Sequence, residues 1–300
     1  MNLRCAVPGL AVFLTPWLAL AAQPRPILPS VLVLPSGPRT LALGDVGITS
    51  RDDEVIFFNP AQLVIANGFS MSGERYAPGS SGAALSAVTR FNGGGIGIGV
   101  RTQSSDGGFI SAPVTPTPFE QTALSSSLEA TVGIAQAYKG VRFGIAGKYA
   151  EQDLGISRLQ RGLVDVGASK VVFGAYTVGV AVQNLGQDAD LPGPLEAELP
   201  RQATLGVSRG GPVGEFDLFG TAAVSWVRSN TLVPAGGLEV NYSWLSGYNI
   251  ALRAGARRPL IGEEALTAGA GLTMDRLSID YALETFTGGR IGNRLGLRIR

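Results

Sequence analysis

The sequence holds few side chains of the kinds that perform acid–base, nucleophilic or metal chemistry. It contains no histidine, and its one cysteine, Cys5, lies in an N-terminal segment that we expect to be removed. Histidine general bases, thiolate nucleophiles and the common zinc and haem sites are therefore excluded from the expected mature chain. The few lysines show no motif beside a serine. We therefore expect no enzymatic activity and no cofactor.

Carboxylate and amide side chains gather at one place that could do chemistry. Asp52 and Asp53 are followed by Asn59, Pro60 and Ala61. Oxygen atoms of this kind suit calcium, but the Asp-x-Asp-x-Gly spacing of a calcium loop is absent. An asparagine before a proline favours a turn closed by its side chain. We therefore predict a structural role for these five residues and no metal site.

A glycine-rich run offers a second candidate. Residues 93–99 read GGGIGIG, and glycines of this kind cradle phosphates where a helix follows them. No helix is expected after this run. Glycine alternating with isoleucine instead predicts a strand whose glycines allow close packing on one face.

The composition indicates which elements must position such residues. The chain has 42 glycines, 45% hydrophobic residues and only 16% charged residues, which is unusual for a soluble enzyme. Beyond the first twenty or so residues, the sequence has no apolar run long enough for a membrane-spanning helix. A β-barrel is then the one remaining structure that could span a membrane.

Apolar residues alternate with small or polar ones in stretches of about ten residues from position 68 onward. Val178, Val180 and Val182, for example, alternate with Gly179, Ala181 and Gln183. The pattern predicts an all-β fold: a transmembrane antiparallel barrel of about fourteen strands, with twelve or sixteen as alternatives. A soluble sandwich or lipocalin-like barrel is the competing interpretation. The expected strands are residues 68–76, 80–91, 93–102, 124–138, 140–151, 161–172, 174–184, 200–209, 213–227, 231–245, 248–258, 264–274, 275–285 and 291–300.

Charged residues keep to one face of these expected strands. The late strands should turn five of them inward, where they could form a polar ladder that guides a ligand or simple salt-bridged pairs. These are Arg253, Asp280, Glu284, Arg294 and Arg298. Large aromatic residues near strand ends predict an interfacial belt made of Trp226, Tyr242, Trp244, Tyr248 and Phe286.

The N-terminus predicts export. Residues 6–20 are apolar, Arg4 precedes them, and Ala19-Leu20-Ala21 is a small-x-small cleavage site, so we expect residues 1–21 to be a signal peptide. Prolines crowd residues 22–38 and predict an extended periplasmic lead-in. Short turns alternate with longer links along the barrel, which places the longer links outside the cell.

The stretch that follows the prolines resembles the N-terminal segment of the PorV/PorQ family. Residues 37–63 read GPRTLALGDVGITSRDDEVIFFNPAQL, with the Arg39-x-Leu41 run, the Asp pair and an aromatic-Asn-Pro-Ala element. Related FadL-type barrels share that last element. The resemblance implies a hatch, or plug, at residues 39–67, which contains the motif Asp52, Asp53, Asn59, Pro60 and Ala61, inside a barrel at residues 68–300.

The same resemblance implies two possible functions. A PorV/PorQ protein would serve type IX protein secretion or hand over exported cargo in the outer membrane. A FadL-like channel would take up small hydrophobic compounds, and a purely structural surface protein is a third possibility. The expected partners are outer-membrane lipid, secretion-system components or cargo, or a hydrophobic small molecule. The 24 basic and 23 acidic residues nearly balance, so no nucleic acid is expected.

Overall fold

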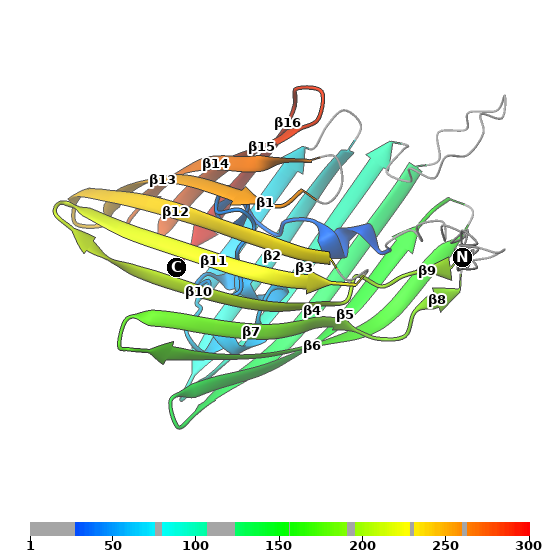
Figure 1. Ribbon diagram of the computed structural model, residues 1–300, viewed down its shortest axis with the longest axis horizontal. Coiled ribbons are helices and arrows are strands. Elements are labelled where there is room, and N and C mark those ends of the chain that lie inside the picture. Colours follow the sequence, from blue (N-terminus) through cyan, green and yellow to red (C-terminus); the bar gives the residue numbers. More distant parts are fainter. Residues whose placement is uncertain are drawn as a thin grey trace, which may run out of the picture.

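Fourteen antiparallel strands form a closed barrel in the part of the chain that the structure describes. The computed structural model describes residues 28–75, 80–106, 124–155, 157–190, 196–228, 231–259 and 263–300. Each barrel strand pairs with the next along the chain, and β1 pairs with β16 to close the wall (Figure 1). A short pair, β8 (Ala189–Asp190) and β9 (Glu196–Ala197), lies between β7 and β10. The barrel strands are β1 (Gly68–Arg75), β2 (Ser80–Phe91), β3 (Gly94–Asp106), β4 (Leu124–Tyr138), β5 (Val141–Asp153), β6 (Arg158–Val172), β7 (Tyr176–Leu185), β10 (Gln202–Val213), β11 (Phe216–Val227), β12 (Thr231–Leu245), β13 (Tyr248–Arg257), β14 (Glu263–Met274), β15 (Leu277–Phe286) and β16 (Arg290–Ile299).

The expected strand order and count are confirmed, with small differences at the ends. β10 continues to Val213 through Gly210, Gly211 and Pro212, which the sequence suggested would begin a turn. Pro212 is tolerated because β10 pairs with β7 only as far as Arg209, so the proline lies where one edge of the strand is unpaired. The β8–β9 pair was not expected.

The barrel has mainly apolar side chains outside and polar ones inside. The expectation that charged residues keep to one face is wrong for Lys170 and Arg209, which are exposed on the outer face beside outward residues of β7. Leu238 is 67% exposed on the outer face, whereas its neighbour Glu239 is 5% exposed in the interior. The same alternation places Leu295 and Leu297 outward and Arg294 and Arg298 inward. This pattern is that of a transmembrane β-barrel and the reverse of a soluble sandwich, whose apolar residues would fill the interior.

Four of the five expected belt residues point outward, and one prediction is wrong. Trp226, Tyr242, Trp244 and Tyr248 are exposed on the outer face. Phe286 is buried. It shares the inward parity of Glu284, because side chains two positions apart on a strand face the same side.

Tight turns join the strands at one end of the barrel and longer links join them at the other. The β4–β5 turn consists of Lys139 (φ 48°) and Gly140 (φ 77°), the left-handed conformation that a two-residue hairpin needs. The β10–β11 turn and the β8–β9 pair lie at opposite ends of the molecule (Figure 1). β1 begins and β16 ends at the tight-turn end.

Residues 28–67, which precede β1, lie inside the barrel and are drawn in blue in Figure 1. They form four short helical pieces: η1 (Ser30–Val33), α1 (Pro38–Ala42), η2 (Asp53–Phe57) and η3 (Pro60–Val64). No helix in the described residues is long and apolar enough to cross a membrane. We keep the name hatch for residues 39–67.

The prolines of the expected lead-in do not place it outside the barrel. Residues 28–38 pack inside the barrel against its wall. Leu28 and Val31 are buried there, and the Ser30 backbone N–H donates to Oε1 of Gln152 (2.9 Å). The reason is that the wall supplies both apolar surface, at Leu163, and hydrogen-bonding groups for this segment. The expected signal peptide and residues 22–27 lie outside the described residues.

Small residues of the wall form the surface on which the hatch rests. A Cβ atom added at Gly95 would lie 2.0 Å from the backbone oxygen of Leu63 in η3. One added at Gly167 would lie 2.0 Å from Oδ1 of Asn59. Glycine is therefore needed at these positions because hatch atoms, of the backbone at Gly95 and of the Asn59 side chain at Gly167, approach too closely for a Cβ atom. This close packing agrees with the expected role of the GGGIGIG run.

Replacing one of these glycines should loosen the hatch. We expect Gly95→Val to destabilise the protein by about 2 kcal/mol, the usual scale for overpacking a tight interior. We also expect faster protease cleavage within residues 39–67. The control is Gly147→Val, because Gly147 has no atom within 4 Å of an added Cβ. Equal unfolding midpoints in urea for the two variants would contradict the close seating of the hatch.

Candidate functional site

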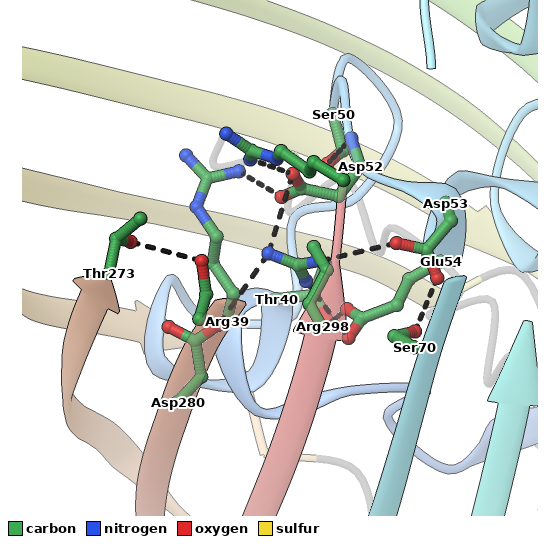
Figure 2. A network of polar contacts seen from close by, with 12 residues as sticks. Arg39, Thr40, Ser50, Asp52, Asp53, Glu54, Ser70, Thr273, Asp280 and Arg298 are labelled. Atoms are coloured by element: carbon green, nitrogen blue, oxygen red, sulfur yellow. Dashed lines mark hydrogen bonds and ion pairs between the residues drawn. The ribbon is translucent and has the colours of Figure 1, made fainter. Parts of the chain in front are cut away.

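Three consecutive acidic residues at the start of η2 converge on one arginine of the last strand. Asp52, Asp53 and Glu54 are all buried, as is Arg298 of β16. The Arg298 guanidinium lies 3.4 Å from Oδ1 of Asp52, 3.1 Å from Oδ1 of Asp53 and 3.2 Å from Oε1 of Glu54 (Figure 2). These ion pairs fix the hatch to the wall, since an unpaired charge in this interior would be strongly destabilising.

Two further arginines complete the pairing of Asp52. Arg39 of α1 binds Asp52 at 2.6 Å, and Arg300 binds it at 2.7 Å. Arg39 also forms a two-pronged contact with Glu239 of β12, at 2.8 and 3.0 Å. Arg39 thus joins two parts of the hatch to the wall, using the planar geometry in which guanidinium groups bind carboxylates most strongly.

The inward charges of the late strands divide into a joined group and two separate contacts. Arg253 binds Glu239 (2.5 Å) and Asp280 (2.6 Å), and Asp280 lies 3.5 Å from Arg298. The other two expected ladder residues lie elsewhere on the wall. Glu284 pairs with Arg257 at 2.9 Å, while Arg294 pairs with Glu74 and donates to the backbone oxygen of Pro35. All five point inward, and each has an ion-pair partner inside the barrel.

The remaining hatch residues singled out in the sequence have structural contacts. Asp53 accepts hydrogen bonds from the hydroxyls of Ser70 and Ser86 on β1 and β2. Asn59 accepts a hydrogen bond from the Ala61 backbone N–H (3.1 Å) through Oδ1, and its Nδ2 donates to the Ile48 backbone oxygen (3.0 Å). Pro60 occupies the first turn of η3, and Ala61 is fully buried.

The ionisation of the acidic residues differs along the run. Burial would raise the pKa of Asp52, but the charges of Arg298, Arg39 and Arg300 outweigh it and hold that pKa well below its usual value. Burial raises the pKa of Glu54 to about 7 despite the attraction of Arg298. The neighbouring carboxylates of Asp53 and Asp52 act in the same direction as burial. Glu54 therefore titrates near neutral pH.

A second buried network, which the sequence reasoning did not identify as a site, lies on β3 to β6. Arg101 donates from Nε to Glu129 (2.9 Å), and Lys148 bridges Glu129 (3.2 Å) and Asp165 (2.8 Å). Arg101 also lies 4.6 Å from the centre of the Phe57 ring, against which it stacks from the wall. Alternation along a strand indicates which charges point inward, but their partners depend on the register between strands.

The hatch face toward β2–β5 is apolar. Val55, Ile56 and Leu63 are fully buried and form one cluster with Ala135 and Ala146 of the wall. A Cβ atom added at Gly133 would lie 2.8 Å from Cδ1 of Ile56. Dispersion and small-residue packing hold this side of the hatch, whereas ion pairs hold the side toward β12–β16.

The carboxylates do not form a metal site in the described residues, where no group of three or more histidine, cysteine or acidic side chains could hold an ion. The acidic residues 52–54 instead form ion pairs with arginines. The arrangement can therefore hold the hatch in place, but it shows no chemistry for bond making or breaking.

Comparisons with known proteins support the architecture. No protein-family model and no curated protein matches the sequence. Among solved structures, the toluene transporter TodX of Pseudomonas putida is similar over 90% of this chain and 98% of its own, with 12% identity and a TM-score of 0.61. A mutant of the monoaromatic hydrocarbon channel TodX aligns over 88% of this chain and 97% of its own, with 13% identity and a TM-score of 0.58. These matches show a shared fold. The PorV/PorQ resemblance stays a prediction.

The elevated pKa of Glu54 gives a pH dependence with a definite sign. Between its ordinary value of 4.5 and about 7, the folded protein binds more protons at Glu54 than the unfolded chain does. This contribution to the unfolding free energy therefore decreases as pH rises through that window, by on the order of 2 kcal/mol. We expect Glu54→Gln to remove it.

The measurement is urea unfolding of the liposome-inserted protein at pH 5 and pH 8. The difference between wild type and Glu54→Gln should change between the two pH values, and Glu215→Gln, in the exposed β10–β11 turn, should show no such change. A Glu54→Gln variant with the same pH dependence as wild type would refute the assignment.

Proposed function

We propose that this protein is a non-enzymatic outer-membrane channel that admits small hydrophobic compounds past its hatch. The observation that carries the proposal is the division of the barrel interior. One side of the hatch is tied by ion pairs to β12 and β16 and by a hydrogen bond to Ser70 of β1, and the other rests through apolar side chains on small residues of β3–β5.

The two kinds of contact differ in how they respond to movement. Separating buried ion pairs leaves uncompensated charge, which costs several kcal/mol. Separating the apolar side costs less per contact, and a hydrophobic ligand entering the gap would replace the lost contacts. The hatch therefore separates from the wall at its apolar side, while the ion pairs keep its other side attached to the wall.

The passage left by such a movement would suit an apolar compound. The wall beneath the apolar side of the hatch presents Gly97, Gly99, Gly133, Ala135 and Ala146, which leave room and add no charge. Pockets for hydrophobic ligands are mostly apolar with few polar groups. Arg101 and Glu129 border this surface and satisfy each other.

The fold likeness supports the same class of substrate. TodX is described as a toluene transporter and a monoaromatic hydrocarbon channel. We propose small hydrocarbons, aromatic ones included, as the compounds that this chain admits. Because the outer face of the barrel is apolar, we propose that outer-membrane lipid surrounds it. The proposal includes export of the chain through a signal peptide at residues 1–21.

A role in type IX protein secretion or cargo hand-over is the second candidate. It rests on the PorV/PorQ resemblance of residues 37–63. The comparisons give it no support, and the solved structures that are similar favour the channel. Secretion partners and cargo therefore stay predictions.

Locking the apolar side of the hatch to the wall tests the channel. In a Cys5→Ser background, the pair Ile56→Cys and Gly133→Cys places one cysteine on each side of the contact between hatch and wall, where Cδ1 of Ile56 lies 2.8 Å from a Cβ atom added at Gly133. Toluene uptake by intact Gram-negative host cells should fall to the level of cells without the protein after oxidation, and should recover after reduction.

The control pair is Val132→Cys with Gly147→Cys, which face each other across β4 and β5 on the outer face. Its oxidation should leave uptake unchanged. Uptake by wild type no faster than by cells without the protein would refute the channel, and uptake by the locked hatch variant at wild-type rate would refute gating by the hatch.

A further inference from the structure

The outer wall carries a recess between β10 and β13. Its volume is about 480 Å³, and most of the residues that line it face outward. Its floor consists of small side chains, and Val207, Leu238 and Arg209 stand around it. The floor residues are Gly220, Ala222, Gly236, Ala254 and Ala256.

A cation stands at one edge of this recess. Arg209 lies with its guanidinium carbon 5.0 Å from the centre of the Tyr176 ring, and its Nη1 donates to the Tyr176 hydroxyl at 2.9 Å. Lys170, on β6, is exposed on the opposite side of β7. Neither cation has a carboxylate partner among the described residues. Two cations therefore flank Tyr176 on the surface that faces lipid.

Lys139, in the β4–β5 turn, is a further exposed cation at the tight-turn end of the wall. The β6 and β7 segment around Lys170 and Tyr176, residues 168–178, contains no aspartate or glutamate, and neither do residues 203–213 around Arg209. The outward cations Lys170 and Arg209 are therefore local features that attract anions.

We propose that the recess binds a phospholipid with an anionic headgroup. Arg209, Lys170 and the Tyr176 hydroxyl hold the phosphate, and one acyl chain lies across the floor of small residues. Basic residues near a membrane surface attract acidic lipids, and a recess of this size offers an acyl chain more contact than a flat wall does. The proposal rests on the membrane location given under Proposed function.

A lipid fits the recess better than a second copy of the chain. A symmetric contact between two copies through this face would bring Arg209 and Lys170 of each close to the same residues of the other. Like charges placed opposite one another in apolar surroundings oppose association. A lipid phosphate instead neutralises them.

The test is native mass spectrometry of the full mature chain released from nanodiscs that contain equal amounts of phosphatidylglycerol and phosphatidylethanolamine. Wild type should retain phosphatidylglycerol in preference to phosphatidylethanolamine. Arg209→Gln and Lys170→Gln should each reduce that preference about fivefold. Ala254→Leu, which fills the floor, should reduce retention of both lipids.

Arg276→Gln is the matched control, because Arg276 is an exposed cation in the β14–β15 turn, away from the recess. It should behave as wild type. Equal retention of the two lipids by wild type, or dimers without lipid whose formation Ala254→Leu abolishes, would overturn the proposal. Failure of the protein to insert into nanodiscs at all would instead overturn the membrane location on which it rests.

Discussion

The ion pairs between Arg298 and the acidic residues 52–54 are the interaction on which the rest of the structure depends. They join the hatch to the last strand across 245 positions of sequence, at Asp53 and Arg298. A charge in this interior is tolerated only when it is paired. Hatch and barrel therefore stabilise each other: the hatch neutralises inward charges that the wall could not otherwise satisfy, and the wall holds a segment with too little regular structure to fold alone.

The uneven distribution of contacts around the hatch is the basis of the proposed channel. Arg39 and Arg298 anchor one side through carboxylates. Val55, Ile56 and Leu63 rest on glycine and alanine on the other, where ligand contacts can replace protein contacts. Apolar surface outside the barrel and paired charge inside it follow from the same alternation along each strand.

Much of the barrel could be predicted from period-two alternation, because a side chain's parity on a strand decides whether it faces lipid or lumen. The same rule shows why Phe286 was misplaced: it lies two positions after Glu284, on the inward face. The partners of inward charges could not be predicted. Arg253, Asp280 and Arg298 were expected to point inward, but their link to Asp52 depends on the path of the hatch. The prolines of residues 28–38 predicted an extended lead-in outside the barrel for a related reason. The sequence does not show that the wall supplies this segment with hydrogen-bond partners and an apolar surface.

Hydrogen exchange of the hatch tests the central claim most directly, by comparing wild type with Arg298→Met in the same lipid bilayer. If the Arg298 ion pairs hold the hatch in place, exchange in residues 39–67 should increase by at least about tenfold, the effect of losing 1.4 kcal/mol, while the strands of β4 and β5 stay as protected as in wild type. Unchanged exchange in residues 39–67 would contradict the account, because the hatch would then be held by its apolar packing alone.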